Sequence, residues 1–533
     1  MPRKIWFFSM LSGLLLGLPW YPVWPGLFLG FALLPLLYVE DYLLQRKQHF
    51  PMHTAFLHFT LTFFVWQFLS FWWISNVTII GALFLITLNS FCYAGFFALS
   101  HYIGRQQGRS FGRLSLLVFW ITFEFISLRI DFGVPWLILG NGLFKHTQLI
   151  QWYEYTGVLG GSLWILGVNF LVADMVLQFR KIHPRIYVFK AAFTLALLIS
   201  PVMCSLNLYK KAVPEGKHIN VALIQPNIDP FTEKFEKISQ EEQLAIILGL
   251  ADSVSHCPID LYVAPETAID NQIWEDNLRN NYSIFAIDEF VHNNPHTAFI
   301  IGAITYKELP ESGKLPATAR FNAQDSLYYE AFNSALYVDT STHIPIYHKS
   351  KLVLGIEKAP LIGLFKFLKK FTIQLGGPEG SFGQQATPTL LGDSTKGIQT
   401  ASVICYESVF GAHVNQFINK GANIIVILTN DGWWGGTPAY SQHFDYARIR
   451  AIETRRWVVR SANTGISGII DSRGNVVSRT QWWQRTVLSG KVALNDIQTF
   501  YVKHGDYIGR VAAFLSVCIL MILVSMRIRK GKV

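Results

Sequence analysis

Three residues with chemically useful side chains stand near the ends of predicted strands in the second half of the 533-residue chain. Glu266 lies in the segment APETA, Lys349 in YHKSKLV and Cys405 in VICYES. Open α/β sheets collect their functional groups at strand ends, so these three side chains are candidates for one site. Each also has an ordinary alternative role, as a solvated carboxylate, a surface amine or a buried thiol.

The three residue types fit acyl transfer through a covalent intermediate. A cysteine thiol, with an ordinary pKa of about 8.5, needs a base or a nearby positive charge to act as a nucleophile at neutral pH. Glu266 can take the thiol proton and later return it to a leaving group. Lys349 can hold a fixed positive charge beside the developing oxyanion, with the backbone N–H after Cys405 as a second donor.

Further polar residues near these three predict a supporting set. Glu357 follows Lys349 by eight residues, and Tyr406 and Glu407 follow Cys405 directly. We expect Glu357 to position Lys349 or a substrate amine, and Glu407 to hold the loop behind the nucleophile. Carboxylates placed close together raise one another's pKa and favour a shared proton.

The elements that must position these residues alternate between β-branched runs and amphipathic stretches from about residue 218 onward. This rhythm predicts a layered α/β domain over residues 207–508 rather than an all-β sandwich. We expect strands at 218–225, 259–264, 298–306, 399–404 and 423–428, a strand pair over 334–349, helices at 238–252, 275–293, 409–420 and 440–456, and a hairpin turning at 472–475.

The chain is too apolar to be a purely soluble or disordered protein. Of its residues, 51% are hydrophobic and 15% are charged, against about 25% charged in ordinary soluble domains. Residues 1–206 predict a membrane domain of about seven transmembrane helices, and residues 509–533 predict a final helix with a basic tail. The apolar runs of this multi-pass α-helical bundle of about eight helices lie near 5–21, 23–43, 54–75, 78–103, 111–128, 160–179, 187–206 and 509–527.

The distribution of Lys and Arg predicts the orientation of the bundle, because cytoplasmic loops carry an excess of these residues. In an eight-pass arrangement, only Arg129 and Lys145 fall in the short loops of the opposite side. Seven crossings from a cytoplasmic N-terminus then place residues 207–508 outside the cytoplasm. The net charge of +10 is therefore interpreted as a topology signal and not as a nucleic-acid surface. The basic residues expected on the cytoplasmic side are Arg3, Lys4, Arg46, Lys47, Arg105, Arg109, Arg113, Arg180, Lys181, Arg185, Lys190, Arg527, Arg529, Lys530 and Lys532.

Cysteine usage and short motifs argue against metals and bound cofactors. Cys92, Cys204, Cys257, Cys405 and Cys518 are too few and too irregularly spaced for a disulfide framework or a zinc site. The sequence contains no glycine-rich phosphate loop and no dinucleotide fingerprint. We therefore expect no metal and no cofactor. A Cys257–Cys405 disulfide, which would silence the nucleophile, stays open as an alternative.

Taken together, these motifs resemble those of the nitrilase, or carbon-nitrogen hydrolase, superfamily. The segments that carry the resemblance are VALIQPNI, PET, KxxLVxxxE, ICYE, TNDGWW, HFDYARIRAIETRR and NTGISG. With apolar helices before and after this domain, the whole chain is similar to the apolipoprotein N-acyltransferase family. The resemblance implies a four-layer αββα sandwich and a catalytic triad of Glu266, Lys349 and Cys405.

The resemblance further implies ping-pong N-acylation without a cofactor. Cys405 would attack the ester of a membrane phospholipid, giving a thioester acyl-enzyme and a lysophospholipid. The α-amine of a diacylglyceryl-cysteine at a lipoprotein N-terminus would then take the acyl group, in the last step of bacterial lipoprotein maturation. The family's location would be the inner membrane, with the catalytic domain on the periplasmic side. Two alternatives remain: a membrane-tethered amidase or nitrilase that uses water as acceptor, and a receptor or transporter with a degenerate nitrilase domain.

Substrate contacts are expected at aromatic and apolar segments. Phe235 stands where many family members carry Trp, and Trp433 and Trp434 precede paired glycines that suit a mobile loop, with core packing as the alternative. Moving a sixteen-carbon chain into water costs on the order of 13 kcal/mol, so the acyl donor must stay at bilayer level. Residues 361–376 interleave large apolar side chains with lysines, which fits a lipid-level mouth or a buried helix with a basic face. The chain also departs from the family at 354–356, where Leu-Gly-Ile replaces the frequent Pro-Phe-Gly.

Overall fold

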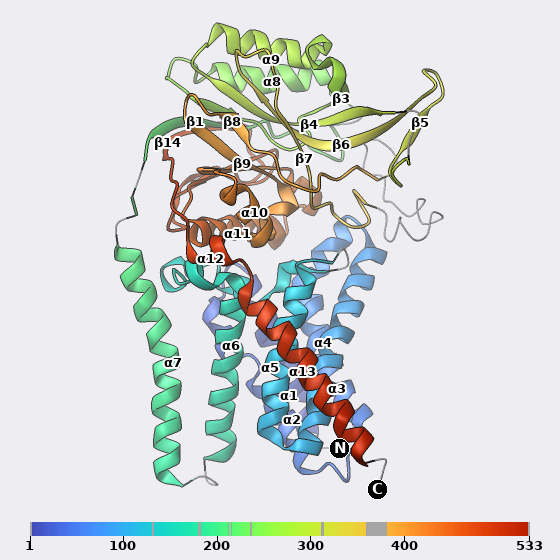
Figure 1. Cartoon of the computed structure of the whole chain (residues 1–533), viewed down its shortest axis with the longest axis vertical. Helices are drawn as coiled ribbons and strands as arrows, with labels where there is room; N and C mark the ends of the chain where they lie inside the picture. Colours follow the sequence, from blue (N-terminus) through green and yellow to red (C-terminus); the bar gives the residue numbers. More distant parts are fainter. Residues whose placement is uncertain are drawn as a thin grey trace. The chain divides into compact units, whose positions relative to one another are not determined.

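The chain divides into two compact units in a computed structural model that describes residues 3–130, 133–179, 183–211, 213–214, 216–234, 237–310, 314–358 and 381–530. One unit comprises Met1–Lys211 together with His504–Val533, and the other comprises Ala212–Lys503. The first is helical, and the second contains both β-sheets (Figure 1).

The first unit is a helical bundle, and the N-terminus and the C-terminus of the chain lie at the same end of it (Figure 1). Its apolar runs form helices because a helix satisfies every backbone N–H and C=O within one segment, as the bilayer interior requires. The helices are α1 (Arg3–Gly17), α2 (Leu34–Gln45), α3 (Met52–Phe71), α4 (Ile79–Gln107), α5 (Arg109–Ser127), α6 (Tyr153–Gln178), α7 (Pro184–Lys210) and α13 (Tyr507–Lys530).

Seven helical segments of the described residues are long and apolar enough to cross a membrane, one fewer than the eight expected. The difference lies at the N-terminus, where the run at 5–21 forms the 15-residue helix α1 and then a 3₁₀ turn over Leu18–Trp20. Pro19 lies inside that turn and cannot supply the N–H that would continue an α-helix. The seven segments are Gly26–Gln45, Met52–Asn76, Ile79–Gln107, Arg109–Ser127, Tyr153–Leu177, Pro184–Lys210 and Tyr507–Ile528.

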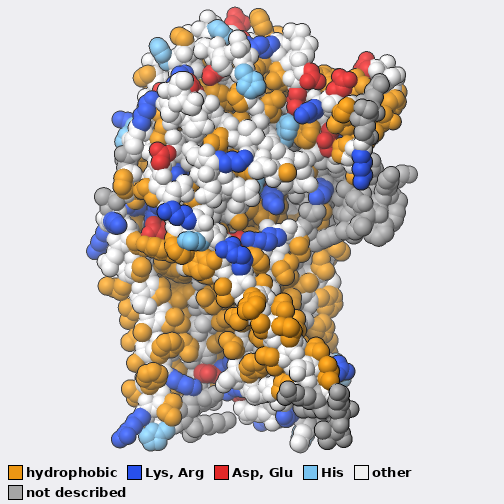
Figure 2. Space-filling model, viewed as in Figure 1, with side chains coloured by type: hydrophobic (Ala, Val, Ile, Leu, Met, Phe, Trp, Pro, Cys, Tyr) orange, Lys and Arg blue, Asp and Glu red, His pale blue; other side chains and the backbone are white. Residues whose placement is uncertain are grey.

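The surface of the helical unit is apolar, as Figure 2 shows. Large hydrophobic side chains such as Ile80, Phe189 and Phe514 are 83%, 71% and 68% exposed. Soluble proteins rarely expose continuous apolar surface of this kind, whereas a membrane-spanning bundle turns it toward lipid tails. The predicted multi-pass membrane bundle is therefore confirmed.

The interior of the helical unit holds aromatic rings and paired charges. Trp66 and Trp120 stack with ring centroids 6.2 Å apart, and Tyr93 lies 4.7 Å from Trp120. Arg109 forms an ion pair of 3.0 Å with Asp41, so charge that enters the bundle is neutralised locally.

The second unit consists of two packed sheets. The first sheet runs β14-β1-β2-β4-β6-β5, with β3 paired to β4 and β7 paired to β6, and the second runs β13-β12-β11-β10-β9-β8. The strands are β1 (His218–Gln225), β2 (Leu261–Val263), β3 (Ile269–Trp274), β4 (Ala298–Leu309), β5 (Arg320–Asn322), β6 (Leu327–Val338), β7 (Ile346–His348), β8 (Leu391–Asp393), β9 (Ile398–Ile404), β10 (Ile424–Thr429), β11 (Val458–Ala462), β12 (Gly468–Ile470), β13 (Val476–Arg479) and β14 (Thr486–Ala493).

Helices cover the outer face of each sheet, which gives four layers (Figure 1). Because successive side chains of a strand point to opposite faces, Val221 and Leu223 of β1 pack toward the second sheet, whereas Ala222 and Ile224 pack against helices. The helices on the first sheet are α8 (Gln240–Asp252) and α9 (Tyr282–Asn293), and those on the second are α10 (Gly411–Asn419) and α11 (Pro438–Thr454). The αββα sandwich implied by the family resemblance is thus confirmed.

One predicted helix of the second unit differs from the structure. The helix expected over 275–293 begins only at Tyr282, after the 3₁₀ segment Glu275–Asn280, and the residues just before it form β3. Asn281 caps the shorter helix by accepting hydrogen bonds from the backbone N–H groups of Ser283 and Ile284. The ends of β2 and β9 lie in the core shared by the two sheets, the seam between them, because Val263, Ile404 and Cys405 all belong to it. The candidate site follows these strand ends.

Candidate active site

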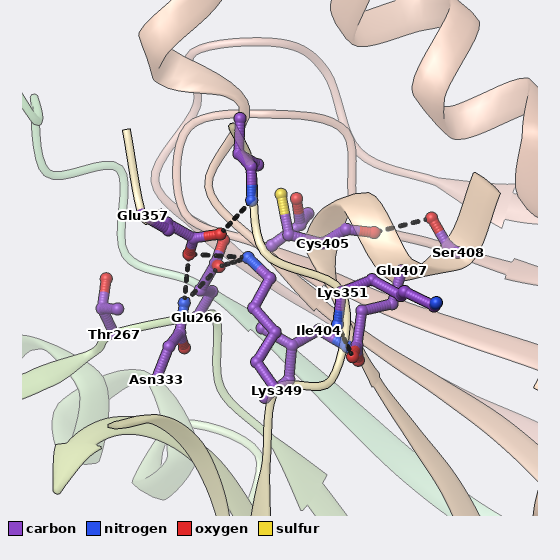
Figure 3. Close-up of polar contacts among 12 residues, drawn as sticks. Glu266, Thr267, Asn333, Lys349, Lys351, Glu357, Ile404, Cys405, Glu407 and Ser408 are labelled. Carbon is purple, nitrogen blue, oxygen red and sulfur yellow. Dashed lines mark hydrogen bonds and ion pairs between the residues drawn. The ribbon is translucent and has the colours of Figure 1, made fainter. Parts of the chain in front are cut away.

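A buried lysine joins two carboxylates at the centre of the candidate site. Lys349 follows β7, and its ammonium lies 2.8 Å from Oε1 of Glu266 and 2.8 Å from Oε1 of Glu357 (Figure 3). Lys349 is 1% exposed and Glu266 is 6% exposed. Burial by itself lowers the pKa of the Lys349 amine, but the two carboxylates raise that pKa well above its ordinary value. The amine therefore stays charged at every physiological pH.

Glu266 is held by a tight backbone packing after β2. Thr267 beside it has a φ of +48°, and Gly302 of β4 lies directly beneath the turn. A Cβ atom on Gly302 would come within 2.5 Å of the carbonyl oxygen of Pro265 and 2.6 Å of the Cα of Glu266. Only glycine leaves room for this turn, so β4 sets the height of the carboxylate above the sheet.

Asn333 is a site residue that the sequence analysis missed. Its side-chain amide on β6 donates hydrogen bonds of 2.8 Å to Glu266 and 2.8 Å to Glu357, in parallel with the Lys349 ammonium (Figure 3). The backbone carbonyl oxygen of Asn333 also accepts a hydrogen bond from the backbone N–H of Lys349 at 2.8 Å. The available signal was a single buried amide within the strand segment AFNSALYV, where an unpaired polar group would be costly.

Glu357 stands on a short turn, next to the positions 354–356 at which the sequence departs from the frequent Pro-Phe-Gly. Oε2 of Glu357 accepts the backbone N–H of Val353 at 2.8 Å, and Gly355 inside the turn has a φ of +85°. The Leu-Gly-Ile sequence at 354–356 therefore supplies a left-handed position without proline. The structure thus brings Glu357 to Lys349, as expected.

Cys405 follows β9, and its side chain lies beside the Glu266–Lys349 cluster (Figure 3). It begins the 3₁₀ turn Cys405–Val409 (η9) with a φ of +52°. Burial raises the pKa of the Cys405 thiol well above its ordinary value, the Glu266 carboxylate raises it further, and the Lys349 ammonium opposes both. The resting thiol is therefore protonated, and nucleophilic attack requires a base.

Glu407 ties the lysine loop to the cysteine strand. Its Oε1 accepts the backbone N–H groups of Ser350 at 2.6 Å and Lys351 at 3.0 Å, and the hydroxyl of Tyr347 at 2.7 Å. Its Oε2 accepts the backbone N–H of Ile404 at 2.9 Å. Burial raises the pKa of this carboxyl, but His413 and the hydrogen bonds outweigh burial and hold the pKa below its ordinary value. One carboxylate thus links the segment after β7 to the end of β9.

The remaining predicted residues have less direct places. Tyr406 packs its ring against Phe410 with centroids 5.1 Å apart, on the nucleophile's own turn. Trp433 packs edge-on against Phe231 at 5.1 Å, and Trp434 packs against His443 at 5.2 Å. Phe235 and the segment 361–376 lie outside the described residues.

The cysteines of the second unit are not joined to one another. Cys257 is exposed, Cys405 is buried, and both are free, so the disulfide alternative does not hold in this structure. Within the part of the chain that the structure describes, no group of three or more His, Cys, Asp or Glu side chains is placed to hold a metal ion.

Comparison with known proteins matches both units. Residues 220–501 match the carbon-nitrogen hydrolase family model, and residues 12–171 match the model of the apolipoprotein N-acyltransferase N-terminal domain. Named apolipoprotein N-acyltransferases align along most of the chain. The protein of Chlorobaculum tepidum is 28% identical over 95% of this chain and 94% of its own length. That of Geobacter metallireducens is 30% identical over 76% and 72%, and that of Thermotoga maritima is 26% identical over 96% and 92%.

The sandwich fold and the family model define the second unit as a carbon-nitrogen hydrolase domain. Together with its helical unit, the chain belongs to the apolipoprotein N-acyltransferase family of membrane-bound acyltransferases. The family resemblance and the enzyme class predicted from the sequence motifs are confirmed.

Proposed function

We propose that this chain transfers an acyl group from a membrane phospholipid to the α-amine of a diacylglyceryl-cysteine at the N-terminus of an apolipoprotein, through a thioester on Cys405. The observation that carries the proposal is the buried Lys349–Glu266 pair beside a protonated thiol, in a chain of this family. The thiol needs a base and the reaction needs an oxyanion partner, and the pair supplies both.

In the first half-reaction, Glu266 accepts the thiol proton while the sulfur of Cys405 bonds to the ester carbonyl carbon of the phospholipid. The described contacts of Glu266 with Lys349 and Asn333 both use Oε1, which leaves Oε2 for the thiol proton. Lys349 and the backbone N–H of Tyr406 stabilise the negative oxygen. The C–O ester bond then breaks, the leaving oxygen takes the proton from Glu266, and a lysophospholipid departs.

In the second half-reaction, the lipoprotein amine attacks the thioester carbonyl. Glu266 accepts a proton from the amine, and the C–S bond breaks as the amide forms. Glu266 passes this proton to the leaving sulfur, so Cys405 returns to its thiol state and Glu266 to its carboxylate. Glu357 supports this step by holding the Lys349 ammonium, while Trp433 and Trp434 belong to the substrate contacts. The second half-reaction distinguishes a transferase from a hydrolase, in which water would take the acyl group.

Intact-mass analysis of the purified full chain tests the proposal. Mixing with phospholipid alone should add one acyl group to the protein, and a diacylated lipopeptide should discharge it as an amide. Cys405→Ala should show no adduct, and Cys257→Ser should behave as the wild type because Cys257 is exposed and outside the cluster. An adduct that is lost equally fast in water would support the amidase alternative. A Cys405→Ala protein that retains full transfer would refute the thioester route.

We further propose an inner-membrane location with the second unit on the periplasmic side. The Lys and Arg residues of the short connections support this orientation, because all but two fall on one side when α1 with its 3₁₀ turn is the first of eight crossings. Exposed Cys257 offers a direct test. Because Cys204 is also exposed, the test starts from Cys204→Ser: a membrane-impermeant maleimide should label this variant, but not the one that also carries Cys257→Ser, in cells whose outer membrane alone has been opened. Labelling only after the inner membrane is broken would reverse the assignment.

A further inference from the structure

The carbonyl group of the nucleophile is held by a buried side chain from another element. His443 lies on α11, and its Nε2 is 3.2 Å from the carbonyl oxygen of Cys405 and 3.0 Å from the hydroxyl of Ser408. That hydroxyl donates to the same carbonyl oxygen at 2.8 Å. We assign the neutral Nε2–H tautomer, in which Nε2 donates toward these two oxygen atoms and Nδ1 accepts from the Arg460 guanidinium.

A charged pair behind the ring fixes its orientation. The Nδ1 atom of His443 lies 3.0 Å from Oδ1 of Asp431 and 2.9 Å from a guanidinium nitrogen of Arg460. Arg460 in turn donates to Oδ2 of Asp431 at 2.6 Å, and Thr429 donates to Oδ1 at 3.0 Å. Burial lowers the pKa of His443, and Arg460 and His443 hold the pKa of Asp431 at about 2 against the effect of burial.

A buried histidine whose two nitrogens are hydrogen-bonded can have a purely structural role. Two observations indicate a further role for His443. His443, Asp431 and Arg460 are all 0% exposed, and a buried charge cluster of this kind is seldom the most stable filling of a core. The Nε2 side of the His443 ring also contacts the carbonyl of Cys405 itself, while Arg460 donates separately to the carbonyl of Ile466. That residue has a φ of +52°, a left-handed conformation that a non-glycine residue keeps only where its surroundings impose it.

Peptide planarity connects this contact to catalysis. The carbonyl of Cys405 and the N–H of Tyr406 belong to one trans peptide unit, in which the two groups point in opposite directions. A carbonyl held toward His443 therefore turns the N–H of Tyr406 away from His443. This N–H is the second oxyanion donor of the proposed mechanism, so rotation of the peptide would remove it from the reaction.

We propose that His443 is a positioning residue that locks the Cys405–Tyr406 peptide and so aims the oxyanion donor, an inference that rests on the proposed function of Cys405. His443 does not touch the substrate. It acts through the carbonyl of Cys405, with Ser408 as the second hydrogen-bond donor to that carbonyl and Asp431 with Arg460 as the fixed support.

A matched pair of variants of the full chain tests the proposal. In His443→Gln, the side-chain amide is long enough to donate to the carbonyl of Cys405, as Nε2 does. In His443→Asn, the shorter amide reaches only the position of Nδ1. Two rates are measured for each: acylation of Cys405 by phospholipid, followed by intact mass, and alkylation of Cys405 by iodoacetamide, followed by peptide mass. Alkylation forms no oxyanion, so it reports thiol access and reactivity without the donor. His292→Asn on α9, whose side chain is 53% exposed, controls for the substitution itself.

We expect the substitutions to slow acylation but not alkylation, and His443→Asn to slow acylation more than His443→Gln. His443→Asn should slow acylation about 10²-fold, the loss typical of one oxyanion donor, and should leave alkylation within about 3-fold. His443→Gln should stay within about 10-fold of the wild type in acylation, because its amide restores the donor. Equal loss in both variants, or a parallel fall of alkylation and acylation, would show a purely structural role and overturn the proposal.

A smaller change keeps the test decisive where a buried His443 variant does not fold. Ser408→Ala removes one of the two donors to the carbonyl without disturbing the charged pair. It should slow acylation about 10-fold and leave alkylation within about 3-fold, as a partial loss of one oxyanion donor predicts. Unchanged acylation in Ser408→Ala would overturn the lock. A wild type that forms no acyl adduct but alkylates normally would instead refute the proposed function, and this inference with it.

Discussion

Replacing Asn333 by aspartate should disable the base of the reaction while leaving every other side chain of the cluster in place. The wild-type amide donates at 2.8 Å to Glu266 and at 2.8 Å to Glu357. Hydrogen bonds to charged groups contribute about 1.5–3 kcal/mol each, so losing both removes about 3 kcal/mol or more. A barrier raised by about 3 kcal/mol slows a reaction about 10²-fold.

The added carboxyl group also changes the protonation of the site. Asn333→Asp places a third carboxyl within hydrogen-bond distance of two others, and like charges at that range raise carboxyl pKa values. Glu266 then shares a proton in the resting enzyme and cannot accept the thiol proton until the pH is raised. The acid limb of the acylation rate should therefore move to higher pH.

Single-turnover acylation with phospholipid alone measures both effects, because no acceptor amine is present to titrate. Asn280→Asp, at an exposed position of the same unit, adds the same charge away from the cluster and should match the wild type. An Asn333→Asp protein that acylates within about 5-fold of the wild type, or one with an unshifted acid limb, would refute the bridging role of the amide.

Three further predictions concern the groups around this cluster. Lys234 donates to the hydroxyl of Thr267, the residue beside Glu266, at 2.6 Å. Burial lowers the pKa of Lys234 to about 8, although Asp270 and Glu266 oppose the shift, so the ammonium that holds this turn loses its charge as the pH rises through that value. Single-turnover acylation should fall above about pH 8 in the wild type and less in Lys234→Arg. Gly302→Ala places a Cβ within 2.6 Å of the Cα of Glu266, and it should cost about 1–3 kcal/mol in denaturant unfolding and abolish acylation. Glu407→Gln leaves at least one buried N–H without an acceptor and should lower the unfolding free energy by about 1–3 kcal/mol; an unchanged unfolding midpoint would contradict this.

The sequence identified the chemically essential residue types because each stands at a strand end in a recognisable segment. Glu266, Lys349 and Cys405 could be named without coordinates, and the structure brings them together. The four-layer arrangement came from family resemblance, since alternation of strands and helices predicts layers but not their number. The N-terminal helix was expected to be longer because hydropathy does not register the break at Pro19.

The missed residues share a physical cause. Asn333 is separated from Glu266 by 67 positions and from Glu357 by 24, and nothing local to a strand says which distant carboxylates its amide will meet. His443 has no ligand-spaced His or Cys near it in the sequence, and its contact with the site is a backbone carbonyl 38 positions away. Side-chain patterns report burial and element type, but contacts between strands depend on the packing of two sheets.

The seam between the two sheets has a consequence for the life of the protein before it is fully folded. The ammonium and its carboxylates are carried by one sheet and the sulfur by the other, so neither half of the sandwich holds a working set of groups. In a newly made or damaged copy whose sheets have separated, the exposed thiol returns to its ordinary pKa of about 8.5 and has neither the base nor the oxyanion partner beside it. Such a copy cannot strip acyl chains from the surrounding lipids, and reactivity appears only with the finished fold.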